Sequence, residues 1–250
     1  MTVLSQRLSR IAAHIPKGAR MADIGTDHAL LPVYLAKTGT IVSAIAGELN
    51  EGPFQAALNQ VRESGVEHVV QVRKGDGLSV VAPGEVDTVV IAGMGGPLMC
   101  AILDAGREVL QQVNRLVLQP NVGVPGVRLW LRDHGWVLQA EELVKEDRHF
   151  YEILVADKRE TADEENEKLY TFLPLACEKG ADSDMLIEMG PLLLRQGHEL
   201  LVDKWSGELD KLDRILNNLK RANSHEAEEK RKWLQQKRTK IAEVLACLSK

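Results

Sequence analysis

The sequence predicts an α/β protein, in which a doubly wound and mostly parallel sheet is followed by an antiparallel helical hairpin. Short apolar runs alternate with segments of helical periodicity over residues 1–160. Four of these runs end in glycines or acidic residues, as strands do where an open α/β sheet binds its ligands. From residue 161 onward the pattern changes to leucines at spacings of three and four, which is typical of long amphipathic helices. We therefore expect an α/β domain at 1–160 and a helical domain at 161–250.

Each element follows from a local pattern. Residues 4–15 carry apolar side chains at helical spacing with no small-residue cleavage site, so we expect a first helix rather than a signal peptide. The segment 53–63 has its apolar residues on one face and a proline near its start, where proline is favourable. The strand runs are mostly continuous rather than alternating, as parallel strands covered on both faces require. Strands are expected at 19–24, 41–46, 69–72, 86–91, 116–118, 136–138 and 150–155, and further helices at 28–37, 96–110 and 127–134.

Composition narrows the class of protein. The 250 residues are 44% hydrophobic and 27% charged, which is ordinary for a globular chain with one sizeable core and a smaller second unit. Because no apolar run approaches the length of a membrane span, we expect a cytoplasmic protein with no membrane partner. The three cysteines lie far apart with no Cys-x-x-Cys pair, so no metal site is expected.

The chemistry of the site is predicted first by residues 22–32, ADIGTDHALLP, which end the first strand and open the next helix. Gly25 lets the backbone turn and a ligand approach, while Asp23 and Asp27 bring negative charge to the same place. A dinucleotide needs a Gly-x-Gly-x-x-Gly turn, which is absent, so the carboxylates favour a cationic ligand such as S-adenosylmethionine (SAM). The alternative is an ordinary strand-to-helix turn capped by Asp27, with His28 as a helix-start residue.

Three later strand ends are predicted to complete a nucleoside site. Glu48 is placed to accept hydrogen bonds from both ribose hydroxyls, and Asp76 to accept one from the adenine amino group. The segment 93–96 leaves space and free N–H groups for the ligand. Each cluster is also explained as a turn or a helix start, but their position at successive strand ends favours a SAM site. The strand ends thus present Asp23, Gly25, Glu48, Asp76, Gly77, Gly93, Met94, Gly95 and Gly96 to the cofactor.

The acceptor is predicted to be an atom with its own lone pair. The Asp/Asn-Pro-Pro-aromatic turn used for exocyclic amines is absent, and Cys100 lies too far into a helix to be the nucleophile used at pyrimidine carbons. A ring nitrogen remains, for which in-line positioning supplies most of the acceleration. The amides of Gln119 and Asn121 offer the donor and acceptor pattern that recognises adenine, although a strand-end turn with Asn121 as a cap is an equal alternative. Tyr151 could also touch the site, but on a late strand we favour a core position.

The last ninety residues predict two long helices that fold back on each other as an antiparallel coiled coil, with a polar break at 223–225. Residues 204–250 hold twelve Lys or Arg against seven Asp or Glu, although the whole chain has a net charge of −5. A solvated helix face explains such a run, whereas the functional hypothesis is that it holds an RNA backbone. The candidate RNA-binding residues are Lys230, Arg231, Lys232, Lys237, Arg238 and Lys240, with Trp233 among them.

Taken together, these motifs resemble the bacterial tRNA (adenine-22-N1)-methyltransferase family, TrmK. The resemblance covers the whole chain and is most specific in ADIGTDHALLP, AGE at 46–48, GDGL at 75–78, IAGMGG at 91–96, LQPN at 118–121 and FYEI at 150–153. It implies a class I SAM-dependent methyltransferase domain with a Rossmann-like sheet, a C-terminal coiled-coil domain and a tRNA substrate. It also implies that residues 119–121 face the base. The residues that it places around the cofactor are Asp23, Gly25, His28, Glu48, Asp76 and residues 94–96. Residues 122–127, VGVPGV, depart from the acidic, helix-forming residues expected there. The sequence therefore does not fix the residue at which the next helix begins.

The implied reaction is an in-line attack by adenine N1 on the SAM methyl group within a folded tRNA. The base must leave its stack, which costs a few kcal/mol that contacts to the RNA backbone must offset. No general base is required, because N1 carries a free lone pair. Asp27 is a tentative catalytic residue to which no role is assigned. The alternatives are a methyltransferase of another substrate class and a non-catalytic RNA-binding protein that retains a SAM pocket.

Overall fold

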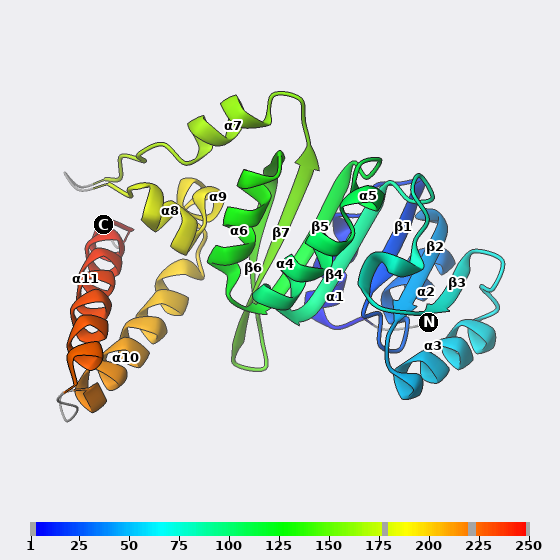
Figure 1. Ribbon diagram of the computed structural model, residues 1–250, viewed down its shortest axis with the longest axis horizontal. Helices are drawn as coiled ribbons and strands as arrows, with labels where there is room; N and C mark the ends of the chain where they lie inside the picture. Colours follow the sequence, from blue (N-terminus) through cyan, green and yellow to red (C-terminus); the bar gives the residue numbers. More distant parts are fainter. Residues whose placement is uncertain (1–3, 177–179, 220–223, 249–250) are drawn as a thin grey trace. The chain divides into compact units, whose positions relative to one another are not determined.

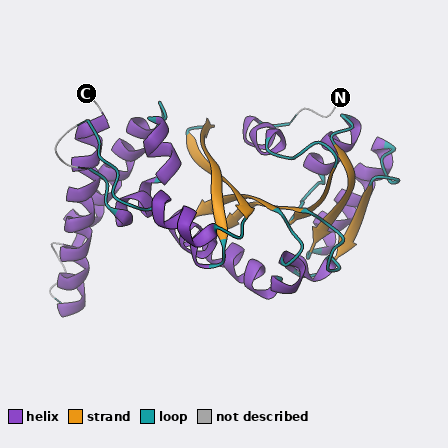
Figure 2. Ribbon diagram, turned by 90° about the horizontal axis from the view of Figure 1, so that it is seen from above, coloured by secondary structure: helices purple, strands orange, loops and turns teal. Residues whose placement is uncertain are grey.

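The computed structural model describes residues 4–176, 180–219 and 224–248. The chain forms two compact units, 1–165 and 166–250, and each is described by itself. Both contain helices, and the first contains the seven-stranded sheet (Figures 1 and 2).

The sheet has the strand order β3-β2-β1-β4-β5-β7-β6. Neighbouring strands from β3 to β5 pair in parallel, whereas β7 runs antiparallel to both β5 and β6. This topology confirms the predicted Rossmann-like sheet, and it brings the ends of β1, β2 and β4 to one edge. The strands are β1 (Ala19–Ile24), β2 (Ile41–Glu48), β3 (Val70–Lys74), β4 (Thr88–Gly95), β5 (Arg115–Val122), β6 (Trp136–Glu146) and β7 (His149–Lys158).

Helices cover both faces of the sheet (Figure 2). Within one group α1 contacts α2 and α2 contacts α3, and in the other α4 contacts both α5 and α6. The strand residues between them are apolar and fully buried, including Met21, Val90 and Val117, because both faces of these strands are covered. The helices are α1 (Gln6–Ala13), α2 (Leu30–Lys37), α3 (Glu51–Ser64), α4 (Gly96–Ala105), α5 (Arg107–Leu110) and α6 (Val124–Asp133), with a 3-10 turn η1 (Gly77–Val80).

The largest differences from the predicted elements lie after β5. Helix α6 begins at Val124 rather than at residue 127, because Gly123 takes a left-handed conformation and a proline occupies the first turn. Strands β6 and β7 form a hairpin much longer than the apolar runs at 136–138 and 150–155. Its turn residues Asp147 and Arg148 both have positive φ, as a type I′ hairpin turn requires. The polar residues of this hairpin show no strand pattern in the sequence. They are in strand conformation because β6 and β7 pair with each other along their whole length.

A fully buried charged cluster joins α6 to this hairpin. Arg128 is 0% exposed and its Nε donates to Glu141 Oε1 at 2.7 Å, while Nη2 donates to Glu152. Burial alone would lower the pKa of Arg128, but the two carboxylates outweigh it and raise that pKa. The cluster therefore keeps its charges only as long as all three partners are present.

We expect Arg128→Met to lower the free energy of unfolding by about 3–5 kcal/mol, because two carboxylates would remain buried without a cation. Denaturant unfolding measures this change. The matched control is Arg132→Met on the same helix, whose partly exposed side chain pairs with Asp133 and whose loss should cost less than about 1 kcal/mol. Equal costs for the two variants would contradict the proposed importance of the buried cluster.

The second unit is helical within its described residues. Its helices α10 (Leu201–Leu219) and α11 (His225–Leu248) pack against each other (Figure 1). Leu216 on α10 and Leu234 and Ile241 on α11 are buried, in agreement with their spacing in the sequence. Supercoiling of the two helices stays a prediction. Three shorter helices without a predicted counterpart precede them: α7 (Ala162–Leu169), which includes the boundary between the two units, α8 (Ser183–Met189) and α9 (Pro191–Gln196).

Candidate functional site

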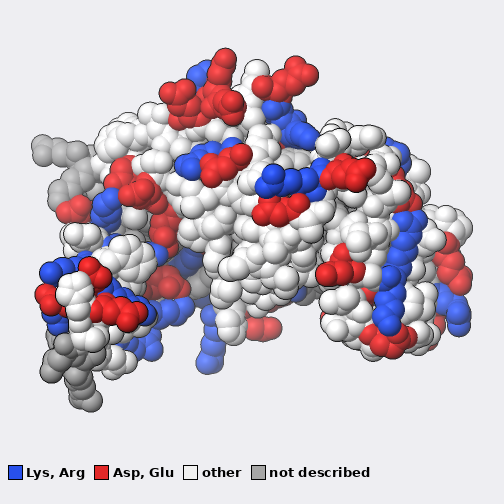
Figure 3. Space-filling model, in the orientation of Figure 1, with Lys and Arg blue, Asp and Glu red and all other residues white. Residues whose placement is uncertain are grey.

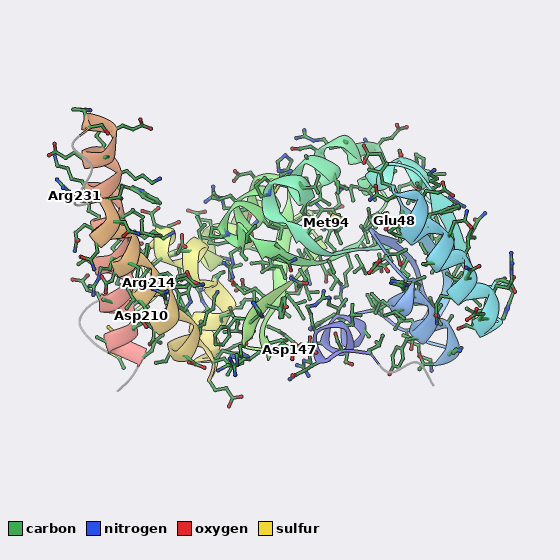
Figure 4. All side chains as sticks on the ribbon, turned by 90° about the horizontal axis from the view of Figure 1, so that it is seen from below. Glu48, Met94, Asp147, Asp210, Arg214 and Arg231 are labelled. Carbon is green, nitrogen blue, oxygen red and sulfur yellow. The ribbon has the colours of Figure 1, made fainter. Side chains whose placement is uncertain are left out.

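A cavity of about 490 Å³ lies at the carboxyl ends of β1, β2 and β4. Glu48 at the end of β2 and Met94 near the end of β4 both line it (Figure 4). The fold therefore brings together side chains from as far apart in the chain as Arg7 and Tyr151. Of the predicted site residues, those that line this cavity are Asp23, Gly25, Asp27, His28, Glu48, Gly93, Met94 and Asn121.

The turn after β1 is held against the end of β2 by its backbone. Gly25 N–H and Thr26 N–H both donate to Gly47 O, at 2.9 and 3.2 Å. Gly25 has φ +71°, and a Cβ at this position would lie 2.1 Å from Met94 Cε. Glycine is thus required here both by the backbone conformation and by the close approach of Met94.

The turn continues in a strained conformation. Asp27 and Ala29 have φ of 54° and 52°, in the left-handed region that residues other than glycine seldom occupy. His28 lies between them, and its Nε2 is 3.7 Å from Asp27 Oδ1. The Asp27 side chain is 72% exposed, which places it at the solvent-facing rim of the cavity.

Two buried carboxylates form the floor of the cavity. Asp23 is 6% exposed and accepts a hydrogen bond from Thr26 Oγ1 at 2.5 Å. Glu48 is 7% exposed and accepts from the backbone N–H groups of Leu49 at 2.9 Å and Asp27 at 3.3 Å. Within the described part of the chain, neither carboxylate forms an ion pair. A cation with hydrogen-bond donors fits this floor, so the residues present suit the ammonium and hydroxyl groups of SAM.

Burial has a clear electrostatic effect at this floor. It raises the pKa of Asp23 to about 6, and the nearby charge of Glu48 acts in the same direction. The hydrogen bond from Thr26 opposes both effects only in part. The surroundings of Asp23 destabilise its ionised form. A bound cation would stabilise that form by offsetting the free energy that burial of the charge costs.

Asp76 and Gly77 lie in a neighbouring cavity rather than in the first one. This second cavity, of about 510 Å³, lies between η1 and α4 and is also lined by the exposed side chain of Leu98. The two cavities belong to adjacent strand ends, because Gly75 N–H donates to Glu48 O at 3.0 Å. An elongated ligand could thus extend from Glu48 towards Asp76.

Gly95 and Gly96 line neither of these two cavities. A Cβ at Gly96 would lie 2.5 Å from Gly123 O, so this glycine lets the start of α4 pack against the end of β5. The close approach places the end of β5, with Asn121, beside the end of β4.

A chain of hydrogen bonds fixes the two candidate amides. Asn121 Nδ2 donates to Gly93 O at 2.8 Å, and Gln119 Nε2 donates to Asn121 Oδ1 at 3.0 Å. Gln119 Oε1 in turn accepts from Arg7 Nη1 at 2.6 Å. Asn121 lines the cavity, whereas Gln119 is fully buried behind it. The orientation of both amides is therefore set by their partners.

Two residues of the cavity were not favoured by the sequence. Arg7 on α1 carries no motif, and helical periodicity gave no reason to place it at a site. Tyr151 lines the cavity and is half-buried, although a core position was the favoured interpretation. The Arg7 guanidinium lies 5.4 Å from the centre of the Tyr151 ring. Only the fold brings these two elements to the edge of the sheet.

The candidate RNA-binding residues on α11 fall into two groups. Lys237 pairs with Glu188 at 2.7 Å, Arg238 with Asp213 at 2.5 Å, and Lys240 with Asp182 at 2.7 Å, so these three join α11 to α8, α10 and the residue before α8. Positive and negative side chains lie interspersed on the visible face of the second unit (Figure 3).

The other three candidates lie nearer the start of α11. Lys232 pairs with Glu228 one turn away at 3.2 Å, whereas Lys230 and Arg231 form no ion pair with a described residue (Figure 4). Trp233 beside them is 58% exposed. This end of α11 thus offers cations and an aromatic ring to a partner.

Within the described residues, no group of His, Cys, Asp and Glu is arranged to hold a metal ion. None of the described helices is both long and apolar enough to cross a bilayer.

Comparisons with known proteins agree with this architecture. The model of the tRNA (adenine(22)-N(1))-methyltransferase family, TrmK, matches residues 21–244. The tRNA (adenine(22)-N(1))-methyltransferase of Bacillus subtilis strain 168 is 37% identical over 243 residues, which cover 97% of each chain. The crystal structure of the B. subtilis m1A22 tRNA methyltransferase TrmK has a TM-score of 0.86 and 36% identity, covering 98% of this chain and 100% of that one. A Streptococcus pneumoniae protein solved in complex with S-adenosyl-L-methionine has a TM-score of 0.80 and 36% identity, with 97% and 100% covered.

Proposed function

The chain belongs to the tRNA (adenine(22)-N(1))-methyltransferase family, TrmK, and from this premise we propose that the cavity at the ends of β1, β2 and β4 is its methyl-transfer site. The enzyme is a SAM-dependent methyltransferase that modifies N1 of an adenine in tRNA. One observation carries the assignment of the site: two buried carboxylates, Asp23 and Glu48, line a single cavity without a cationic partner among the described residues.

The cofactor supplies an electrophilic methyl group on a sulfonium, and the residues of the cavity bind its polar parts. Asp23 binds the ammonium group, for which a buried carboxylate is the natural partner. Glu48 accepts hydrogen bonds from the ribose hydroxyls, as acids at this strand end do in Rossmann-like sites. Asp76, two positions after β3, would accept from the adenine amino group, and Leu98 lines the same neighbouring cavity as Asp76.

The amides of Gln119 and Asn121 hold the target adenine. Asn121 presents its amide at the cavity, and the bond from Gln119 prevents it from rotating. Holding the base so that the N1 lone pair faces the methyl group converts an encounter between two molecules into a step within one complex. N1 needs no deprotonation before the reaction. The cationic product then loses a proton from its amino group to water, and the exposed rim residue Asp27 is the candidate to accept that proton.

The start of α11 is proposed to bind the RNA backbone, far along the chain from the site. Extruding the target base from its stack costs a few kcal/mol, which contacts elsewhere on the tRNA must offset. Lys230 and Arg231 are available for phosphates, and the exposed Trp233 can stack on an unpaired base. Lys237, Arg238 and Lys240 instead hold the second unit together through their ion pairs.

Removing Lys230 and Arg231 together by alanine substitution should raise KM for tRNA by about tenfold at moderate salt and leave SAM affinity unchanged. Two fewer phosphate contacts should reduce the slope of log affinity against log salt by about 1.8. Filter binding at several salt concentrations measures the slope. The matched control, Lys237→Ala with Arg238→Ala, removes the same number of charges and should lower the stability of the second unit. An unchanged salt slope in the first double variant would exclude this end of α11 from the interface.

A single assay tests the proposed function. Labelled SAM is incubated with unmodified tRNA, with the same tRNA carrying guanine in place of adenine 22, and with the Asp23→Ala variant. We expect label in the first tRNA only, and only with the unsubstituted enzyme. Binding of SAM and tRNA without transfer would favour a non-catalytic RNA-binding protein, and SAM binding with no tRNA binding would favour another substrate class.

A further inference from the structure

We propose that the tip of the β6–β7 hairpin, residues 145–150, binds the tRNA backbone beside the adenine that receives the methyl group. The inference rests on the proposed function, because it takes the cavity at the ends of β1, β2 and β4 as the methyl-transfer site and tRNA as the substrate. It adds a contact to RNA on the first unit, whereas the candidate cations of α11 all belong to the second.

The hairpin extends past the rest of the sheet at the edge that carries the cavity. Strand β7 pairs with β5 only from Leu154 to Asp157, whereas its pairing with β6 continues to His149. Since β7 is antiparallel to β5, the part of the hairpin between Leu154 and the turn lies at the carboxyl edge of the parallel strands. Tyr151 in this part lines the cavity, and the turn projects below the sheet in Figure 1. The tip is therefore an extension of one wall of the site.

The turn holds an arginine in a backbone conformation that suits glycine. Asp147 and Arg148 have φ of 47° and 65°. A type I′ turn needs positive φ at both positions, and Asp-Gly is a common pair there because aspartate and glycine adopt this conformation most readily. The turn thus explains the aspartate but not the arginine. Backbone strain that a fold retains at one position indicates that the side chain there has a use.

The side chain of Arg148 is available to a partner. It is exposed and forms no ion pair with a described residue. The nearby acid Glu146 faces α1 instead, where its carboxylate accepts from the backbone N–H groups of Gln6 at 2.7 Å and Arg7 at 3.4 Å. Glu146 is thus engaged with α1, and the guanidinium at the turn can meet an anion from solution.

Aromatic rings lead from the tip towards the cavity. His149 Nδ1–H donates to Asp147 O at 2.9 Å, which fixes the ring, and the ring centre is 6.3 Å from that of Tyr151. Alternate residues of a strand share a face, so His149 and Tyr151 form a row that ends at the cavity. On the other face, Lys145 Nζ lies 5.1 Å from the centre of the Phe150 ring. Cations beside a row of rings are the pattern with which proteins bind unpaired nucleotides.

The geometry of an extruded base explains why a phosphate should pass here. An adenine turned out of its stack into the cavity stays joined to its two neighbours through phosphates, which then lie at the mouth of the cavity. A guanidinium at the mouth can bind one of them through paired hydrogen bonds and so keep the base in place during methyl transfer. An acidic segment of a protein would also suit the charge of Arg148, but it would use neither the rings nor the cavity beside them. RNA is therefore the favoured partner.

Arg148→Gly tests the proposal, because glycine removes the cation and at the same time relieves the strain of the turn. The melting temperature should not fall, and the affinity for SAM should change by less than about twofold. Binding of unmodified tRNA should weaken by about threefold to tenfold at moderate salt, and the slope of log affinity against log salt should fall by about 0.9. Arg148→Lys should recover most of the affinity. The matched control is Lys17→Ala, which removes an exposed cation before β1, at the opposite edge of the sheet, and should leave tRNA binding unchanged.

A modified substrate tests where the contact lies. Uncharged methylphosphonates replace the phosphates on either side of adenine 22 in the tRNA, and binding is compared for the unsubstituted protein and Arg148→Gly. The unsubstituted protein should lose affinity for the modified tRNA. The variant should lose little more, because both changes remove the same contact.

Three results would overturn the inference. An unchanged tRNA affinity and salt slope in Arg148→Gly would exclude the tip from the RNA interface and leave a protein as its partner. Losses that add when the variant meets the modified tRNA would place the contact away from the target adenine. A loss of SAM affinity as large as the loss for tRNA would mean that the substitution only disturbs the cavity. Failure of the unsubstituted protein to methylate tRNA would instead remove the proposed function itself, which no result with Arg148→Gly can imitate.

Discussion

Replacing Asp23 with asparagine is expected to weaken SAM binding at least tenfold and at the same time to stabilise the protein without cofactor. The carboxylate is 6% exposed and has no cationic partner among the described residues. Burying this charge therefore lowers the stability of the folded protein until the donor binds. Asparagine keeps the size and can still accept the hydrogen bond from Thr26, but it carries no charge.

The stabilisation has a defined dependence on pH. Asp23 has a pKa of about 6 in the folded protein, against 3.8 for an aspartate carboxyl group in water. Between these values the folded state holds a proton that the unfolded chain has released, so stability without cofactor falls as the pH rises from about 4 to about 6. At pH 7 the cost has reached its full size, and asparagine should recover about 1–3 kcal/mol of it.

Thermal unfolding and calorimetric titration at pH 7 measure the two effects together. A higher melting temperature with a weaker affinity for SAM would agree with the account. An Asp23→Asn protein that is less stable and binds SAM as well as before would show that Asp23 has a structural role and does not meet the donor.

Replacing Asn121 with alanine is expected to lower kcat for tRNA methylation by about a hundredfold, with the affinity for SAM changed by less than threefold. Asn121 is held on one side by Gly93 O and on the other by Gln119, and it is the amide of this pair that lines the cavity. Losing a positioned polar group that orients the reacting atoms typically costs two to three orders of magnitude in rate.

The chain offers a matched control in Asn114, which immediately precedes β5 and therefore lies at the opposite end of the same strand. Asn114→Ala should leave both kcat and SAM affinity unchanged. Single-turnover methyl transfer at saturating SAM separates the chemical step from binding. If both asparagine variants transferred methyl groups at the rate of the unsubstituted enzyme, Asn121 could not be the residue that holds the base.

Much of the first unit could be predicted because its signals are local. Strands β2 and β4 contain nearly continuous apolar runs, and the glycines and acids that end β1 and β2 are the residues that a turn beside a ligand needs. Asp23, Gly25 and Glu48 could therefore be assigned to one edge of the sheet before their spatial arrangement was known. The cavity that all three line agrees with that expectation.

Other features depended on contacts that no local pattern contains. Arg7 lies in α1, and the periodicity of that helix predicts only which of its residues are buried. Hydrogen bonds from α1 to Glu142 and Glu146 of β6 hold the helix beside the cavity. The six cations of α11 could not be sorted from sequence, because their partners Asp182, Glu188 and Asp213 belong to other segments of the second unit. Asp76 was expected in the same crevice as Asp23, yet it lines the neighbouring cavity together with η1 and α4.

The affinity of the unsubstituted protein for SAM, measured by calorimetry between pH 5 and pH 7, tests the central claim most directly. A buried carboxylate that must ionise to meet a cation should make binding about tenfold weaker at pH 5 than at pH 7, because Asp23 is protonated below about pH 6. Since His28 lines the same cavity, the Asp23→Asn protein is titrated alongside and should show a much smaller dependence. Affinity that stays constant over this range, or that varies equally in both proteins, would contradict the assignment of this cavity to a cationic methyl donor.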